Sequence, residues 1–326
     1  MTLEPADRPV LVAGAPRTGT TWIASVLAQA GDVAWINEPD NEWPNSYALK
    51  AKLPVGRFPA LVPEERAPRP YEVLWERALT GHRESARRQQ VAWKLDRGER
   101  TMQELWRAMC DHASPRVTPR LRVLAWTAAA PSTRVPGRIV MVKTVHAPLA
   151  LEWIAARFRP RVVVVLRHPL NVLASWVELG WGGSALDTNP RILERFGRRW
   201  TLPELAPDAS PLQRIAWEVG LFTSALHGGA GEHPDWLPAS HESLCQDTEG
   251  GFHDLFARLG WPWPSRASAY VEETNRPGTG FTTFRVAAEQ PESWRRRLSP
   301  EQIGEAWSVL CRFGSPWVER VGRDLE

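Results

Sequence analysis

The residues best suited to bind an anion form the run Gly14-Ala-Pro-Arg-Thr-Gly19-Thr-Thr21. A buried-strand pattern over residues 9–15 precedes the turn, and an apolar helix pattern follows it. Successive backbone N–H groups at such a turn, together with the helix dipole, bind phosphate or sulfate. The spacing is that of the phosphate-binding loop G-x-x-x-x-G-K-[ST], but Thr20 occupies the lysine position. We therefore predict an anion site whose cation is Arg17, a bidentate donor, in place of lysine.

A second cation is expected at the end of the β-branched run Arg161–Leu166. A nucleoside triphosphate site usually has an aspartate there to hold magnesium, whereas this chain has Arg167. Ser175, two turns into the following helix, can face the same anion. Ligands of parallel sheets bind at the carboxyl ends of the strands, where both motifs lie. The pattern predicts an anionic ligand that is held without a metal ion.

Two residues are candidates for a general base. Glu38 follows a short strand pattern over residues 33–37, and His146 follows another strand in the segment Lys143-Thr-Val-His146. A positioned base that removes a proton in the transition state typically contributes about 10²- to 10⁴-fold to the rate. Both candidates stay open from the sequence, and we favour Glu38.

The elements that must position these residues alternate between strand and helix patterns. Strands are predicted at 9–15, 33–37, 91–95, 138–143, 161–166 and 236–240, and helices at 20–31, 71–90, 98–112, 148–158, 169–179 and much of 188–228. Such alternation indicates a parallel sheet with right-handed crossovers. We expect one α/β domain over residues 1–326, a P-loop-like three-layer fold with a central parallel sheet flanked by helices. Irregular insertions are expected at about 38–70 and 114–137, and helices in the tail from residue 281.

The composition excludes several classes of protein. The chain has 326 residues, of which 43% are hydrophobic and 24% charged, so it can bury a sizeable core. A net charge of +3 gives no reason to expect nucleic acid as a partner. No apolar run is long enough to cross a bilayer, and the N-terminus lacks a signal-peptide core. The three cysteines are widely spaced, which predicts neither a disulfide framework nor a zinc site and fits a cytoplasmic protein.

Two of the motifs resemble signatures of the sulfotransferases that use 3′-phosphoadenosine-5′-phosphosulfate (PAPS). Pro16-Arg-Thr-Gly-Thr-Thr-Trp22 resembles P-[KR]-x-G-[TS]-T-W, the loop that holds the 5′-phosphosulfate. The strand followed by Arg167-His-Pro-Leu-Asn-Val-Leu-Ala-Ser175 resembles R-x-P-x-x-x-x-x-S, the 3′-phosphate site. The resemblance implies transfer of a sulfuryl group from PAPS to a hydroxyl of a small-molecule acceptor, with release of adenosine 3′,5′-bisphosphate (PAP).

Weaker matches extend the resemblance along the chain. Glu38 resembles the catalytic glutamate of the carbohydrate-type branch, and Lys143-Thr-Val-His146 resembles the K-T-H motif of cytosolic members with one residue inserted. Ser240–Leu244 resembles the Y-E-x-L segment near adenine, with His241 in place of tyrosine. Arg276-Pro-Gly-Thr-Gly280 resembles the loop that closes over the 3′-phosphate, and Trp294–Ser299 resembles a helix start of bacterial members, here capped by Ser299.

The resemblance implies a role for each matching residue. The implied catalytic residues are Arg17, Glu38, Lys143 and His146. The implied PAPS-binding residues are Pro16, Arg17, Thr18, Gly19, Thr20, Thr21, Trp22, Arg167, Ser175 and Arg276. The tryptophan-containing loop after Glu38 is expected to form part of the acceptor pocket, which favours an apolar or glycosylated natural product. No metal is implied, and the oligomeric state is left open.

Two other functions are compatible with the same anion loop. A degenerate P-loop kinase would bind ATP with magnesium at least as well as PAPS. A nucleotide-binding module without turnover would bind PAP tightly, and substitutions at Glu38 and His146 would have no effect in any transfer assay.

Overall fold

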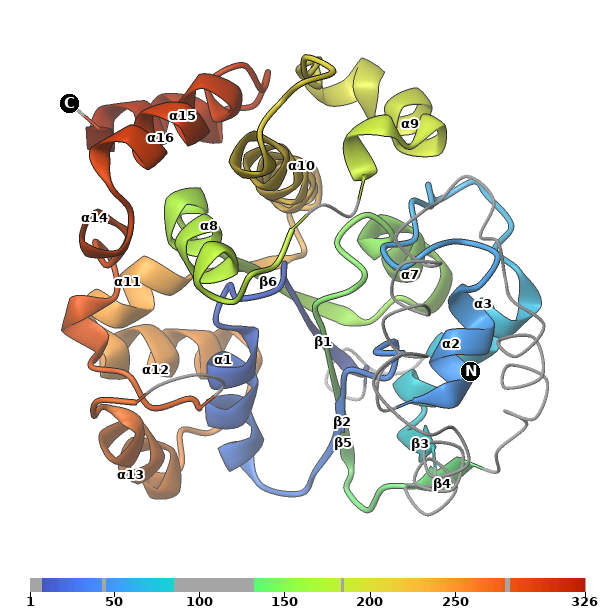
Figure 1. Ribbon diagram of the computed structural model, residues 1–326. Helices are drawn as coiled ribbons and strands as arrows, with labels where there is room; N and C mark the ends of the chain where they lie inside the picture. Colours follow the sequence, from blue (N-terminus) through green and yellow to red (C-terminus); the bar gives the residue numbers. More distant parts are fainter. Residues whose placement is uncertain (1–7, 43–44, 85–131, 183–184, 279–281, 326) are drawn as a thin grey trace, which may run out of the picture.

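The computed structural model describes residues 8–42, 45–84, 132–182, 185–278 and 282–325. Its centre is a five-stranded sheet in the order β2-β5-β1-β6-β7, and every neighbouring pair of strands is parallel (Figure 1). The strands are β1 (Val10–Ala13), β2 (Val33–Asn37), β5 (Ile139–Thr144), β6 (Arg161–Leu166) and β7 (Leu237–Ser240). The predicted α/β fold with a central parallel sheet is confirmed.

Helices cover both faces of the sheet because its central strands are apolar on both sides. In β1, Val10 and Val12 belong to one hydrophobic core, and Leu11 and Ala13 belong to the other. Figure 1 shows α1, α12 and α13 on one side of the sheet and α2, α3 and α7 on the other. The helices on the first side are α1 (Thr20–Leu27), α12 (Thr248–Arg258) and α13 (Ser265–Thr274). The core that contains Leu11 and Ala13 also includes residues of α2 (Ser46–Lys52), α3 (Arg69–Leu79), α7 (Leu151–Phe158), α8 (Pro169–Glu178) and α10 (Pro211–Glu232).

The C-terminal part of the chain is helical, as the sequence predicts. It contains α14 (Trp294–Arg297), α15 (Pro300–Leu310) and α16 (Trp317–Leu325), while α9 (Pro190–Trp200) and α11 (His241–Gln246) occur earlier in the chain. Ser299 caps α15 in a capping box with Gln302, which confirms the predicted cap. Of the described residues, none belongs to a helix that is both long and apolar enough to cross a membrane.

Two segments differ from the sequence prediction. The stretch at 38–70 is not irregular throughout, because Asn45 caps α2 by accepting hydrogen bonds from the next turn, and Ala48 and Ala51 bury against the core. The helix predicted at 71–90 ends at Leu79. The chain then turns at Gly81, whose φ of 80° suits glycine, into β3 (His82–Glu84).

Strand β3 pairs in an antiparallel manner with β4 (Ser132–Arg134), inside the stretch at 114–137 predicted to be irregular. The strand predicted at 91–95, the helix predicted at 98–112 and the first part of that irregular stretch lie outside the described residues.

Candidate active site

A cavity of about 720 Å³ lies at the carboxyl edge of the sheet. Every strand of the sheet leads into it: the loop after β1, Glu38 after β2, Lys143 in β5, Arg167 after β6 and His241 after β7 all line its wall. Parallel strands place their carboxyl ends at one edge, so residues distant in sequence meet there.

The loop between β1 and α1 has a tightly constrained backbone. Arg17 has a φ of 72° and Gly19 a φ of 92°. At Gly19, a Cβ would lie 2.3 Å from a ring carbon of His241, so only glycine fits. The hydroxyl of Thr18 donates back to the Ala15 carbonyl at 2.8 Å, and Trp176 Nε1 donates to the Pro16 carbonyl at 3.0 Å. These contacts hold the backbone N–H groups of the turn in a fixed arrangement.

Three arginines lie around this loop. Burial lowers the pKa of Arg17, and the charges of Arg285 and Arg297 lower it further. Burial lowers the pKa of Arg167 to about 10. The pKa of Arg285 is lowered by burial and then by Arg297. Like charges and desolvation both disfavour these cations, so an anion bound among them would relieve an unfavourable electrostatic arrangement.

Arg17 and Arg167 are held in place by each other and by α8. Arg17 Nε donates to the hydroxyl of Ser175 at 2.9 Å, and Arg167 donates to the Arg17 carbonyl at 2.8 Å. Arg167 Nε is buried and has no hydrogen-bond partner among the described residues. A buried charged donor without a partner is costly, which indicates that a ligand completes the site.

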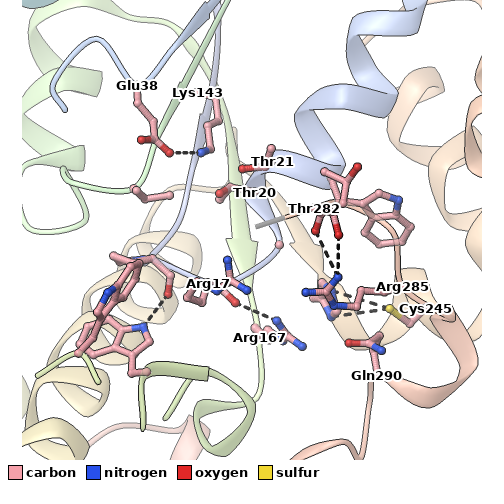
Figure 2. A pocket seen from close by; sticks show the side chains of 18 of the residues that line it. Arg17, Thr20, Thr21, Glu38, Lys143, Arg167, Cys245, Thr282, Arg285 and Gln290 are labelled. Atoms are coloured by element: carbon pink, nitrogen blue, oxygen red, sulfur yellow. Dashed lines mark hydrogen bonds and ion pairs between the residues drawn. The ribbon is translucent and has the colours of Figure 1, made fainter. Parts of the chain in front are cut away.

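Glu38 and Lys143 form an ion pair at another wall of the cavity (Figure 2). The parallel register pairs Asn37 of β2 with Lys143 of β5, and the Glu38 N–H donates to the Lys143 carbonyl at 2.7 Å. The other carboxylate oxygen of Glu38 accepts from Asn41 Nδ2 at 2.6 Å. The two donors fix the orientation of the carboxylate, and in the view of Figure 2 Thr20 and Thr21 lie between this pair and the arginines.

A buried polar network supports the turn that carries Glu38. Asp40 accepts hydrogen bonds from the Thr144 hydroxyl at 2.7 and 2.9 Å. Lys52 is fully buried, donates to the Asp40 carbonyl at 2.8 Å and pairs with Glu42 at 2.5 Å. Lys52 lowers the pKa of Glu42 to about 2 against the opposing effect of burial. The network ties the Glu38 turn to α2 and β5.

Replacing Asp40 by asparagine should change how stability depends on pH. Burial raises the pKa of Asp40 from 3.8 to about 6, so the folded protein binds this proton more tightly than the unfolded chain. The resulting stabilisation is complete below about pH 4 and is lost as the pH rises through 6. Relative to Asp40→Asn, the free energy of unfolding of the unmodified protein should fall by up to roughly 3 kcal/mol between pH 4 and 7.

Denaturant unfolding at pH 4, 5.5 and 7 measures this difference. Asp235→Asn, which changes an exposed aspartate, serves as the control and should follow the unmodified protein at each pH. Parallel pH dependences for Asp40→Asn and the unmodified protein would show that Asp40 gains no proton on folding.

His146 lines the cavity and is 4% exposed. Its ring stacks on Phe58, with centroids 5.7 Å apart, and its Nδ1 has no hydrogen-bond partner within the described part of the chain. Burial, and then the charge of Lys52, hold the pKa of His146 well below its ordinary value. The ring is therefore neutral at physiological pH.

A second aromatic surface lies beside the anion loop. The ring of Trp22 packs edge-on against His241, at 5.7 Å between centroids, and against Phe252 at 5.0 Å. Burial raises the pKa of the neighbouring Cys245 thiol to about 12, so this wall is uncharged. Trp22, His241 and Cys245 all line the cavity and can contact a planar ring.

The structure brings most of the predicted site residues to this one cavity. The lining residues among them are Pro16, Arg17, Gly19, Thr20, Thr21, Trp22, Glu38, Lys143, His146 and Arg167. Thr18 turns back onto its own loop and Ser175 lies behind Arg17, so neither lines the wall. Trp43, the tryptophan closest to Glu38 in its loop, lies outside the described residues.

Arg276 does not line the cavity. Its exposed guanidinium lies over the ring of Phe284, 4.2 Å from the centroid, and Arg285 lines the wall instead. The backbone N–H of Arg285 donates to the Thr274 carbonyl, which returns this segment to α13 beside the cavity. In sequence, Arg276–Gly280 resembles the loop that closes over the 3′-phosphate, whereas in the structure Arg285, nine positions after Arg276, lines the cavity.

Several other lining residues were not predicted, among them Asn41, Arg57, Phe58, Trp181, Glu218 and Arg285. For Glu218 a signal existed in the sequence, since it is an acidic residue within the apolar run Ile215–Leu226. The others lie in loops or at helix ends without a periodic pattern.

A lysine-free phosphate-type loop at the carboxyl edge of a parallel sheet, with arginines after two of the strands, has the features of an anion-binding site. The chain belongs to the Sulfotransferase family, whose sequence model matches residues 9–206. Family membership makes it a transferase of sulfuryl groups. A comparison with curated protein sequences gave no match.

Three solved structures are similar to this chain. The sulfotransferase domain of the Synechococcus PCC 7002 olefin synthase has a TM-score of 0.41 and 14% identity, over 92% of this chain and 93% of that one. Sulfotransferase STF9 from Mycobacterium avium has a TM-score of 0.39 and 14% identity, over 94% and 77%. A retinol dehydratase in complex with androsterone and inactive cofactor PAP has a TM-score of 0.37 and 16% identity, over 95% and 81%.

Proposed function

We propose that this protein transfers a sulfuryl group from PAPS to a hydroxyl of a small-molecule acceptor and releases PAP. The observation that carries the proposal is the placement of Arg17, Arg167 and Arg285 around a phosphate-type loop that has threonine in the lysine position. The lowered pKa values of all three guanidiniums favour a ligand with more than one anionic group.

Different residues of the cavity would bind different parts of PAPS. The loop N–H groups and Arg17 would hold the phosphosulfate, since they lie at the start of α1 where the helix dipole adds to their charge. Arg167 and Arg285 would hold the 3′-phosphate, with the unpartnered Arg167 Nε as one donor. Trp22 and His241 would contact the adenine ring.

Glu38 is assigned as the general base. Its carboxylate lines the cavity and would take the proton of the acceptor hydroxyl as that oxygen bonds to sulfur and the bond from sulfur to the bridging oxygen breaks. Lys143 holds the carboxylate, and Lys143 and Arg17 would stabilise the charge that develops on the sulfuryl group and the leaving phosphate. His146 is neutral and buried. It would accept a hydrogen bond from the substrate hydroxyl, or donate one to it, rather than remove its proton.

The acceptor would occupy the aromatic part of the cavity. Phe58, Trp176 and Trp181 line that part with apolar rings, and Trp176 also fixes the anion loop. Rings arranged in this way bind an apolar or ring-bearing body through burial and stacking. The acceptor class proposed is therefore a hydroxyl on an apolar framework, including glycosylated natural products.

Calorimetry with PAP tests the proposal directly. We expect PAP to bind with a higher affinity than ATP with magnesium, and radiolabelled PAPS to transfer its sulfur to an acceptor in candidate extracts. Tighter binding of ATP with magnesium would favour the kinase alternative. Tight PAP binding without any transfer, and with Glu38→Gln and His146→Ala silent, would favour a nucleotide-binding module.

Two variants test whether Arg285 or Arg276 contacts the 3′-phosphate. Arg285→Ala should weaken PAP binding by about 10- to 100-fold, because it removes a hydrogen bond between charged groups. Arg276→Ala is the matched control from the same segment and should leave the dissociation constant unchanged, since that side chain lies outside the cavity. The reverse result would restore the role that the sequence assigned to Arg276.

A further inference from the structure

The cavity contains a buried carboxylate that the proposed reaction does not use. Glu218 lies in the middle of α10, is 2% exposed and lines the cavity. Its neighbours along the helix are almost all apolar and buried. A carboxyl group buried in such surroundings needs polar contacts to offset the cost of its desolvation.

The position of Glu218 on the helix places it at the acceptor end of the cavity. Phe222 lies one turn later on the same face of α10, and its ring centroid is 4.7 Å from that of Phe58 and 6.1 Å from that of Trp176. Ile215, three residues earlier, packs so closely on Gly182 that a Cβ there would lie 2.2 Å from it. Glu218 thus lies between a residue that packs on Gly182 of the cavity lining and a residue that packs against the aromatic rings of the acceptor part.

Glu218 takes part in an interaction within the protein. A carboxylate offers about four lone-pair positions, so an internal interaction and a hydrogen bond from a ligand are compatible at the same side chain. The proposed catalytic pair does not belong to α10, since Glu38 follows β2 and Lys143 belongs to β5. The wall formed by α10 therefore presents a second polar group to an acceptor whose reacting hydroxyl is at Glu38.

We infer that Glu218 recognises a second hydrogen-bond donor on the acceptor, so that the substrates are ring-bearing alcohols or phenols with a further hydroxyl or ammonium group. The inference rests on the proposed function and adds the polar chemistry of the substrate class. A donor that reaches Glu218 would make a hydrogen bond to a buried side chain, and an apolar acceptor of the same shape would not make it.

Three matched probes test this inference on protein saturated with PAP. The probes are 2-naphthol, which has no second donor, 2,6-dihydroxynaphthalene, and 6-(aminomethyl)-2-naphthol, which carries an ammonium group. We expect at least one of the two donor-bearing probes to bind about tenfold more tightly than 2-naphthol in calorimetry. The probe with the larger increase in affinity identifies the donor as a hydroxyl or an ammonium group.

Glu218→Leu should abolish the preference, and the isosteric Glu218→Gln should reduce it while the affinity for PAP stays unchanged. Glu232→Gln changes an acidic residue of the same helix that does not line the cavity, and should keep the full preference. PAP binding and the melting temperature of each variant establish that it is folded.

Equal affinities for the three probes, or no binding of any of them to the PAP-loaded protein, overturn the inference. A preference that persists in Glu218→Leu overturns it as well. In each of these cases PAP binding and transfer from PAPS leave the proposed function standing. An unmodified protein that binds no PAP overturns the proposed function, and the inference with it.

Discussion

Glu38→Gln should lower kcat by about 10²- to 10⁴-fold, the usual contribution of a general base. Glutamine keeps the size of the side chain and can still accept a hydrogen bond from Lys143, but it cannot take the acceptor proton. Binding of PAP should remain within a few-fold of the original value, because Glu38 lies away from the arginines in the cavity (Figure 2). The rate of PAP release with an accepted hydroxyl compound and the calorimetric affinity for PAP measure the two effects.

His146→Ala is the matched comparison for this prediction. It should reduce kcat less than tenfold and act mainly on the KM for the acceptor, because its low pKa makes the ring a weak base. A collapse of kcat in His146→Ala together with a mild loss in Glu38→Gln would transfer the role of base to His146. Melting temperatures separate either effect from a loss of folding.

Arg17→Ala should lower kcat by about 10²- to 10³-fold, the cost of removing one preorganised donor from developing negative charge. Arg17 lines the cavity at the anion loop, and its Nε is oriented by the Ser175 hydroxyl at 2.9 Å. Arg17→Lys keeps the charge but loses the forked geometry, so it should recover only part of the rate. Single-turnover transfer from radiolabelled PAPS measures the chemical step apart from product release.

Ser175→Ala separates positioning of Arg17 from direct contact with the nucleotide. If the hydroxyl acts through Arg17, kcat falls by a few-fold and the affinity for PAP is retained. If the hydroxyl contacts the 3′-phosphate, as the sequence motif implies, the dissociation constant for PAP rises instead. A nearly unchanged kcat in Arg17→Ala would contradict the proposal that this arginine stabilises developing charge, regardless of the result for Ser175→Ala.

The predicted site residues that the structure brings to one cavity are those whose positions depend on local chain geometry. The turn from β1 into α1 needs glycines at defined positions, and Arg167 follows a strand that is recognisable from its β-branched residues alone. Parallel strands then bring these ends together, so the anion loop, Glu38, Lys143 and Arg167 meet as expected. The same local reasoning failed at Gly81, where one glycine ends a helix and starts β3.

The tertiary structure decided which groups complete the cavity. Arg285 lines it and Arg276 does not, because the chain folds back on itself between them: the Arg285 N–H reaches the Thr274 carbonyl, and the Arg276 guanidinium lies over the ring of Phe284. The ion pair of Lys143 with Glu38 follows from the register of β5 against β2, which adjacent residues do not specify. Glu218 stands out in the sequence as an acid within an apolar helix, but only the packing of α10 against the aromatic wall turns it toward the cavity. Local patterns determine where a strand ends, whereas side-chain packing across the whole molecule determines what faces that end.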